Sequence, residues 1–213
     1  MKIEREIDSF LANVTGVIHV GASRGQERYI YDKYDLNVVW IEPIPEIYDI
    51  LVKHIEPYPK QSAFQCLIAD IDDKKYRFRI ADNKGESSSM LDFKVGRQLW
   101  PKIRFVKTII LRGITLATLL KRERIKAGKY DALVLDTQGS ELLVLNGAIP
   151  ILNHFKYIKV EVADFEAYKR GCQTRDIEAF MKEHQYKEIY RHNQAIRKRG
   201  YHVYDIVYQK ENA

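Results

Sequence analysis

Cysteine and long apolar runs are what this sequence has least of. Its 213 residues include two cysteines, Cys66 and Cys172, which stand far apart without partners at the spacing of metal ligands. This argues against a disulfide framework and against a zinc site, so we expect a reducing, cytoplasmic setting and no bound metal. No apolar run approaches the roughly 20 residues that cross a bilayer, and the first ten residues lack the apolar core of a secretion signal. We therefore expect no insertion into a membrane.

Repeats, low-complexity tracts and linkers rich in proline, glycine or serine are also missing. Apolar residues make up 46% of the chain and charged residues 30%, which is the composition of a globular protein rather than a disordered one. A chain of 213 residues is long enough to bury a substantial core. We therefore predict a single domain over residues 1–213.

The charge balance is mildly basic, with 35 lysines and arginines against 29 acidic residues and a net charge of +6. Such a balance permits binding to nucleic acid, nucleotide-sugars or anionic surfaces but requires none of them. The densest basic segment is RHNQAIRKRG, residues 191–200. It is either a solvated connection in a hairpin or a patch that contacts phosphate groups.

Short apolar runs alternate along the chain with segments of helical periodicity. The runs predict strands, because they are rich in Val, Ile and aromatic residues and are continuously apolar, as strands buried on both faces are. They cover residues 17–20, 37–42, 63–69, 131–136 and 157–163. Helical patterns cover residues 27–34, 45–55, 116–125, 141–152 and 174–184. This alternation predicts an α/β fold with a mostly parallel sheet and helices on both sides.

Two regions depart from the alternation. Residues 75–82, with charges at alternate positions, and residues 105–116 are both typical of extended chain, so we predict a β-hairpin insertion at approximately 76–112. At the C-terminus, residues 186–192 and 201–209 are separated by about ten residues without a helical pattern, which suits an antiparallel pair. A parallel sheet that closes with one antiparallel strand is typical of one large class of Rossmann-like enzymes.

The stretch VIHVGASRGQE, residues 17–27, combines a strand, a turn with two glycines and the start of a helix. Such a turn either only reverses the chain or places backbone N–H groups at the carboxyl edge of the sheet, where polar ligand groups bind. Gly21 and Gly25 let the backbone bend and let a ligand approach without a Cβ atom in the way. Glu42 closes the second strand about 20 residues later, where an acidic residue accepts hydrogen bonds from the ribose hydroxyls of an adenosine.

The spacing of the two glycines distinguishes between adenosine cofactors. The dinucleotide fingerprint is G-x-G-x-x-G, in which the middle glycine lets a pyrophosphate approach the backbone. Here Ala22, Ser23 and Arg24 separate the glycines, and Ser23 stands at the middle position. A cofactor without a pyrophosphate fits this turn better. S-adenosylmethionine is the candidate, with its methionine end against the turn and its ribose against Glu42.

Four stretches carry a family resemblance, in matching order and spacing: HVGASRGQE, WIEPIPEIYD, LIADIDDKKYRFRIADNKGESSSML and YDALVLDTQGSELLVLNGA. The chain resembles the FkbM-type family of S-adenosylmethionine-dependent methyltransferases over about residues 17–208. The resemblance implies a Rossmann-like class I methyltransferase fold, with a mostly parallel seven-stranded sheet and an antiparallel last strand. It also implies O-methylation of a hydroxyl on a sugar, a glycan or a small natural product. His19 is a departure, because most similar sequences have an acidic residue there.

Methyl transfer to an alcohol needs a nearby base, because a hydroxyl is a poor nucleophile at neutral pH. Asp136 ends the strand 131–136, Gln138 and Glu141 follow at the turn into the next helix, and Glu161 lies in the strand 157–163. The carboxyl ends of these strands face the cofactor crevice, so we predict that these four residues are catalytic. Two of them have alternative roles, since Asp136 suits a helix cap and Glu141 complements a helix dipole.

The remaining cofactor contacts follow from position and from the resemblance. We predict binding by the glycine turn, the end of the second strand and later polar positions: His19, Gly21, Ala22, Ser23, Gly25, Glu42, Pro43, Asp70, Ser88 and Asp136. Asp70 follows the third strand, where class I methyltransferases often place a polar group near the adenine. Ser88 belongs to the serine run 87–89, which is otherwise a flexible polar loop.

Two other functions stay open from the sequence. One is an RNA methyltransferase that uses the basic segment 191–200 and would lose affinity steeply as salt increases. The other is a Rossmann-like binding protein that has lost its chemistry. We expect a small-molecule or glycan acceptor as the partner and no nucleic acid. The sequence identifies neither the acceptor nor the oligomeric state.

Overall fold

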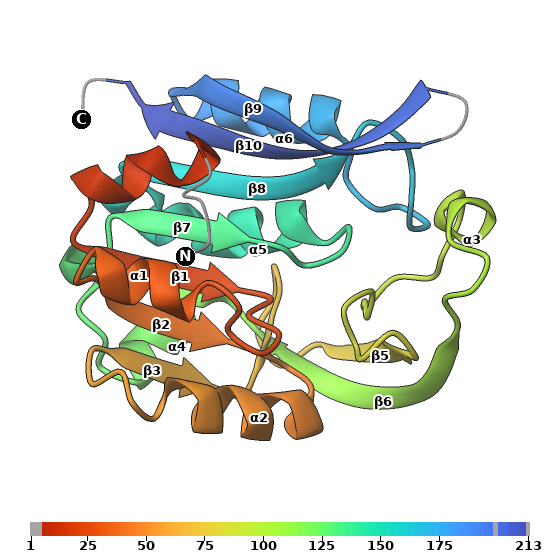
Figure 1. Ribbon diagram of the computed structural model, residues 1–213, viewed down its shortest axis with the longest axis horizontal. Helices are drawn as coiled ribbons and strands as arrows, with labels where there is room; N and C mark the ends of the chain where they lie inside the picture. The colour runs from red at the N-terminus through yellow and green to blue at the C-terminus, as the bar shows by residue number, and fades with distance from the viewer. Residues whose placement is uncertain (1–5, 198–199, 212–213) are drawn as a thin grey trace.

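A seven-stranded sheet forms the centre of the computed structural model, which describes residues 6–197 and 200–211 (Figure 1). The strand order across this sheet is β3-β2-β1-β7-β8-β10-β9. The bounds of these strands, in that order, are Gln61–Phe64, Asn37–Ile41, Gly16–Val20, Ala132–Leu135, Tyr157–Ala163, Tyr201–Lys210 and Tyr186–Arg197. All neighbouring pairs are parallel except those made by β10, which is antiparallel to both β8 and β9. This confirms the predicted seven-stranded sheet and its antiparallel closing strand.

Helices cover both faces of the sheet, because the inner strands are apolar on both sides. Ile18 and Val20 of β1 pack into one core cluster and Val17 into another. The 3₁₀ helix η1 (Glu6–Asn13), α1 (Arg28–Lys33) and α2 (Pro45–Ile55) lie over one face. The helices over the other face are α4 (Leu116–Arg122), α5 (Glu141–Ala148) and α6 (Thr174–Glu183).

The helix boundaries follow the predicted ones with two differences. The predicted helix 141–152 consists of α5 followed by a 3₁₀ helix, η3 (Ile149–His154), which has Pro150 in its first turn. Proline lacks the N–H that a continuing α-helix needs, so the helix type changes there. The helix η1 was not predicted, and a second short 3₁₀ helix, η2, covers Ala127–Lys129. Among the described residues, no helix combines the length and the apolar character that a membrane crossing requires.

The predicted strand 63–69 is wrong as a single element. Its first part belongs to β3, which pairs with β2, whereas β4 (Leu67–Ile68) pairs with β6 in a separate three-stranded sheet of order β4-β6-β5. Gln65 and Cys66 lie at this change of partner. An apolar run shows that a segment is buried, but it does not show which strand is beside it.

The predicted insertion is present as an antiparallel hairpin of β5 (Lys75–Ala81) and β6 (Phe105–Ile114). The segment between these strands contains the short helix α3 (Gly96–Leu99). The carboxyl ends of β1, β2, β7 and β8 point toward this insertion (Figure 1). The insertion therefore faces the edge of the sheet at which α/β proteins bind their ligands.

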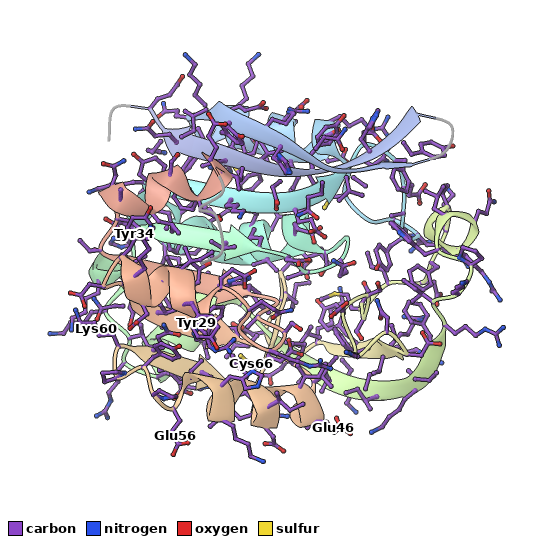
Figure 2. All side chains as sticks on the ribbon, in the orientation of Figure 1. Tyr29, Tyr34, Glu46, Glu56, Lys60 and Cys66 are labelled. Atoms are coloured by element: carbon purple, nitrogen blue, oxygen red, sulfur yellow. The ribbon has the colours of Figure 1, made fainter. Side chains whose placement is uncertain are left out.

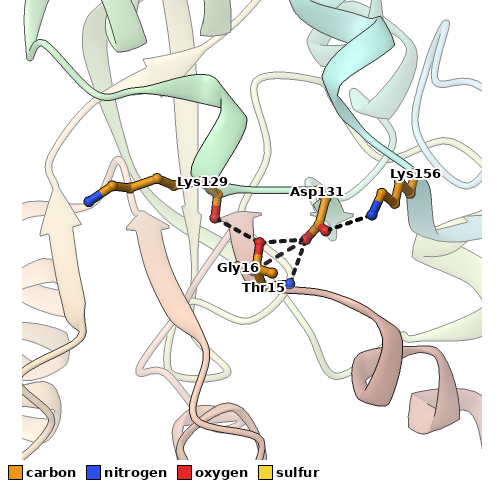
Figure 3. A network of polar contacts seen from close by, with 5 residues as sticks. All are labelled: Thr15, Gly16, Lys129, Asp131 and Lys156. Atoms are coloured by element: carbon orange, nitrogen blue, oxygen red, sulfur yellow. Dashed lines mark hydrogen bonds and ion pairs between the residues drawn. The ribbon is translucent and has the colours of Figure 1, made fainter. Parts of the chain in front are cut away.

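A polar network at the opposite edge of the sheet holds β1 and β7 together (Figure 3). The carboxylate of Asp131 accepts hydrogen bonds from the backbone N–H groups of Thr15 at 2.7 Å and Gly16 at 3.3 Å. Its other oxygen lies 3.5 Å from Nζ of Lys156. Because Asp131 is buried and fully engaged with the chain itself, we assign it a structural role.

Candidate active site

The turn between β1 and α1 is the first part of the site. Gly21 has a φ of +83° and Gly25 a φ of +67°, both in the left-handed region that favours glycine. A Cβ atom on Gly21 would lie 1.8 Å from the carbonyl oxygen of Asp136, and one on Gly25 would lie 2.8 Å from Cδ1 of Leu51. We expected these glycines to leave room for a ligand. The structure shows that the room beside each Cα is taken by the protein itself.

Glu42 lies at the end of β2, directly against this turn. One of its carboxylate oxygens accepts a hydrogen bond from the backbone N–H of Ser23 at 2.9 Å, and the other accepts one from Ile44 at 2.9 Å. Ser23 can present its N–H in this way because its φ is +46°. Burial raises the pKa of Glu42 to about 7, and the two N–H donors oppose that shift. The carboxylate is held in one orientation, and each oxygen keeps a second lone pair.

A first cavity opens beside Glu42, at the carboxyl ends of β1, β2 and β7. Seven of the residues predicted for the site line it: Gly21, Ser23, Glu42, Pro43, Ser88, Asp136 and Gln138. Apolar side chains, among them Ile44, Ile47 and Phe78, form another part of its wall. The hydroxyl oxygen of Ser23 is buried and has no hydrogen-bond partner within the described residues. Cys66, labelled in Figure 2, is partly buried and also lines this cavity, whereas the labelled Glu46 and Glu56 lie on and just after α2 at the edge of the view.

Four residues predicted to contact the cofactor are not part of this lining: His19, Ala22, Gly25 and Asp70. Asp70 accepts a hydrogen bond from the Tyr76 hydroxyl at 2.7 Å, so its carboxylate is engaged with the insertion. Ser88 does line the cavity, and its hydroxyl oxygen also accepts a hydrogen bond from the N–H of Ala81 at 3.0 Å. The neighbouring Ser89 donates its hydroxyl to the carbonyl oxygen of Gln138 at 2.9 Å, so the serine run helps to hold the β5–β6 insertion against the site.

His19 faces the layer formed by η1 and α1. Its Nδ1 is 3.1 Å from the Tyr31 hydroxyl, and its ring stacks on Trp40 with 5.0 Å between centroids. Burial, with a smaller contribution from the charge of Lys159, lowers the pKa of His19 to about 3, so the imidazole is neutral. It lines a third cavity on this side of the sheet together with Lys159 and Asp205.

The side-chain amide of Gln138 donates hydrogen bonds to two carboxyl groups. Its Nε2 donates to Oδ1 of Asp136 at 2.6 Å and to Oε1 of Glu161 at 3.0 Å. Its Oε1 accepts a hydrogen bond from the Tyr168 hydroxyl at 2.8 Å. Three of the four predicted catalytic residues are therefore brought into one hydrogen-bonded group from β7, the following turn and β8.

The surroundings of Asp136 and Glu161 raise the pKa of both carboxyl groups. Burial and the charge of Glu161 raise the pKa of Asp136 well above its usual range. Burial and the charge of Asp205 raise the pKa of Glu161 to about 7. Asp205 stands directly opposite Glu161 in the antiparallel register of β10 and β8, and it accepts a hydrogen bond from Gln194 at 2.6 Å. A carboxylate with a raised pKa is a stronger base near neutral pH.

Glu141 differs from the other three. One oxygen accepts hydrogen bonds from the backbone N–H groups of Thr137 at 2.8 Å and Gly139 at 3.1 Å, and the other accepts one from the Cys172 thiol at 3.1 Å. Its carboxylate is thus tied to the turn that follows β7. In this geometry Glu141 positions Gln138, whose φ of +55° is unusual for a residue with a side chain.

A second cavity adjoins the first, and Gln26, Glu86, Asp136 and Gln138 line both. It also contains Glu141 and Glu161, together with residues that the sequence did not point to, namely Trp100, Tyr168 and Gln194. Asp205 was missed too, although a single carboxylate in the apolar stretch 201–209 was a visible signal. Trp100 and Tyr168 lie outside the regular helices and strands, in connections where no periodicity marks a functional residue.

Within residues 6–197 and 200–211, no group of three or more His, Cys, Asp or Glu side chains is arranged to hold a metal ion. Among the described residues that line the first and second cavities, there is also no Lys, Arg or His. The chain is basic overall, yet the described residues that line this site carry only acidic and neutral side chains.

The chain is similar to known proteins both in its sequence and in its fold. The model of a family described as the methyltransferase FkbM domain matches residues 19–188. None of the curated proteins matches the chain.

Similar solved structures include an uncharacterised protein from Listeria monocytogenes serotype 4b, with a TM-score of 0.54 and 7% identity, covering 100% of this chain and 70% of that one. A magnesium protoporphyrin IX methyltransferase from Synechocystis PCC 6803 with bound SAH has a TM-score of 0.53 and 8% identity, covering 96% and 81%. A putative RNA methyltransferase from Pyrococcus horikoshii has a TM-score of 0.51 and 14% identity, covering 97% and 80%. At these identities the likeness concerns the fold, and it confirms the predicted Rossmann-like architecture.

Proposed function

The chain belongs to the FkbM family of methyltransferases, and from this membership we propose that it transfers a methyl group from S-adenosylmethionine to a hydroxyl of a sugar, a glycan or a small natural product. The observation that carries the proposal is the pair of carboxyl groups, Asp136 and Glu161, at the junction of two adjoining cavities. One cavity suits the cofactor and the other suits the acceptor.

The first cavity has the features that S-adenosylmethionine requires. Glu42 offers two oriented oxygens to the ribose hydroxyls. Apolar side chains such as Phe78 provide a surface for the adenine. The cofactor carries positive charge on its sulfonium and its ammonium, and a lining that includes Glu42, Glu86 and Asp136 without any described basic residue favours a cation.

Bound S-adenosylmethionine supplies an electrophilic methyl carbon. Glu42 and the β1–α1 turn would hold the cofactor, and the acceptor oxygen would form a bond to that carbon as the carbon–sulfur bond breaks, with the electron pair leaving on sulfur. The hydroxyl proton passes to a carboxylate of the Asp136–Glu161 pair. Gln138 keeps both carboxyl groups in place through its two N–H donors, and Tyr168 in turn holds the Gln138 amide. The proposal thus assigns base catalysis to the pair and positioning to Gln138 and Tyr168.

The charge of the site argues against the RNA alternative. A phosphate-bearing acceptor would meet Glu86, Asp136 and Glu161 in the second cavity, with no described Lys, Arg or His in its lining. The basic segment 191–200 includes residues 198 and 199, which lie outside the described residues. A role for that segment and a cytoplasmic location stay predictions.

Two measurements test the proposed function. Calorimetry should detect binding of S-adenosylmethionine, and incubation with a panel of neutral sugars should then release S-adenosylhomocysteine. Glu161→Gln should lower kcat by about 100-fold or more, because base catalysis contributes about that much. Glu56→Gln, a change at the outer end of α2, is the control and should leave kcat unchanged. A folded wild-type protein that binds no cofactor would refute the proposal.

The same chemistry predicts how the rate varies with pH. The pKa of Glu161 is raised to about 7, and only the ionised carboxylate can accept the hydroxyl proton. We therefore expect kcat to increase as the pH increases toward 7 and to level off above it. The measurement is kcat at saturating substrates between pH 5.5 and 8.5. A rate that decreases over this range would contradict the assignment of the carboxyl pair as the base.

A further inference from the structure

The lining of the second cavity combines apolar and polar side chains. Trp100, Ile103 and Val203 contribute apolar surface, whereas Asn83, Gln138 and Glu161 contribute amide and carboxyl groups. These side chains come from the β5–β6 insertion, the turn after β7, and strands β8 and β10. A ligand that fills this cavity therefore meets both apolar surface and several hydrogen-bonding groups.

The Trp100 ring packs closely against neighbouring residues. It follows α3 directly, and its ring packs against Phe165 with 6.2 Å between centroids. A Cβ atom on Gly96 would lie only 2.8 Å from Cζ3 of the Trp100 ring, so the ring rests against the backbone of α3. Phe165 is supported in turn by Tyr201 of β10, at 4.8 Å. The indole is half-buried, and the cavity lies beside it.

We infer that Trp100 is the platform for a pyranose ring of the acceptor. This inference rests on the proposed function and specifies its substrate class. The C–H groups on one face of a pyranose carry partial positive charge, and the face of an indole carries the negative part of its quadrupole. The hydroxyls around the edge of the sugar then face Asn83, Glu161 and Gln138. One hydroxyl would thereby lie near the carboxyl pair that accepts its proton.

A neutral pyranose ring matches the lining of this cavity better than a nucleotide or an acyclic polyol does. A nucleotide would stack on an indole as well, but its phosphate groups would lie beside Glu86 and Glu161 without any described basic side chain. An acyclic polyol would satisfy the amide and carboxyl groups but would present no continuous apolar face to Trp100. The comparison of cyclic with acyclic polyols therefore isolates the contribution of the indole.

Intrinsic fluorescence provides a direct test, because the chain has only two tryptophans. Trp40 is 0% exposed, and its Nε1 donates to Gln61 at 3.0 Å in the core of the sheet. Titration with methyl pyranosides should change the emission of the wild-type protein but not that of Trp100→Phe. Matched acyclic alditols should change neither. An equal response in Trp100→Phe, an equal response to alditols, or no response of the wild type to any pyranoside would overturn the inference.

Steady-state kinetics add a second readout. Trp100→Ala should raise the acceptor KM by about tenfold, while Trp100→Phe, which keeps an aromatic face, should stay within about threefold of the wild type. The Kd of S-adenosylmethionine should be the same for all three proteins. An unchanged acceptor KM in Trp100→Ala would overturn the inference. The emission titration requires no methyl transfer, so its failure is distinct from a failure of the proposed function, which cofactor calorimetry detects.

Discussion

His19 and Glu42 lie on neighbouring strands, and both are buried ionisable residues at the same edge of the sheet. His19 is 5% exposed and pairs with Trp40 in the register of β1 and β2, while Glu42 follows β2 and is 4% exposed. Burial shifts the pKa of each toward its neutral form, to about 3 for His19 and about 7 for Glu42. Burial and a shifted pKa therefore do not separate a site residue from a core residue here.

The partners of the two side chains do separate them. His19 contacts Tyr31 and Trp40, and the charged groups near it are matched within the protein, since Nζ of Lys159 lies 2.9 Å from Asp8. Glu42 is oriented by two backbone N–H groups and lines a cavity that has no described basic residue. His19 also lines a cavity, but the charges of Lys159 and Asp8 beside it match each other, whereas no described basic residue matches the charge of Glu42 in the first cavity. Glu42 is therefore the stronger candidate for ligand binding.

Among the substitutions that test this comparison of His19 with Glu42, we expect the largest effect from Glu42→Gln. Loss of the charged acceptor for the ribose hydroxyls should weaken the binding of S-adenosylmethionine by about 100-fold, because two hydrogen bonds to a charged group contribute about that much. Calorimetry of the variant beside Glu56→Gln measures the change. Equal affinity in Glu42→Gln and wild type would place the cofactor elsewhere.

The pH dependence of cofactor affinity provides a second test of whether the charged form of Glu42 binds the cofactor. Glu42 has a pKa of about 7 in the protein, so it loses its charge as the pH decreases through 7. We expect the affinity for S-adenosylmethionine to decrease by up to about tenfold per pH unit below 7. Calorimetry at pH 6, 7 and 8 provides the measurement, and Glu42→Gln should show a flat profile over this range.

His19 should affect stability rather than cofactor binding. The pKa of His19 in the folded protein, about 3, lies below its ordinary value. Between these two pH values, His19 is protonated in the unfolded chain and neutral in the folded protein, so protonation favours unfolding. The contribution of His19 is fully present above about pH 6.5 and is lost as the pH decreases toward 3. Between pH 7 and pH 5, we expect the free energy of unfolding to decrease by about 2 kcal/mol from this group alone.

Urea denaturation of wild type and His19→Gln at both pH values measures that difference, because the variant lacks the titrating group. Cofactor affinity at pH 7.5 should stay within about threefold of the wild type, since His19 is not among the residues that line the first cavity. A large loss of affinity in a folded His19→Gln would show that His19 contacts the cofactor after all.

The smallest expected effect is that of Tyr31→Phe. This change removes the hydroxyl that lies 3.1 Å from Nδ1 of His19 and keeps the ring that packs against Trp40. We expect a decrease of about 1 kcal/mol in the free energy of unfolding, measured by urea denaturation at pH 7.5. Cofactor binding should be unaffected. A decrease above about 3 kcal/mol would indicate that the hydroxyl supports more of the core than this contact.

Much of the fold was predictable because the apolar residues within a short segment indicate whether that segment is buried. The apolar runs at residues 17–20 and 131–136 coincide with β1 and β7, and a carboxylate at the end of the second strand identified Glu42. The split of residues 63–69 into β3 and β4 was not predictable, because both parts are apolar and only their partners differ.

The arrangement within the site was predictable only in part. Asp136 and Glu161 were candidates by their positions at strand ends, but their shared contact with Gln138 depends on a turn whose conformation no sequence pattern announced. Glu141 was a candidate for the same reason, and it is tied to the backbone of that turn instead. Trp100 lines the second cavity, where its ring packs against Gly96 and Phe165, and these contacts depend on the tertiary structure.

The sequence by itself determined the alternation of strands and helices, the glycine turn and the carboxylate at position 42. These features depend on neighbours close along the chain, where apolar spacing and backbone freedom act directly. The tertiary structure decided which polar groups meet around the two cavities. Asp136, Glu161 and Trp100 come from distant segments, and their proximity results from strand order and from the packing of the insertion against the sheet.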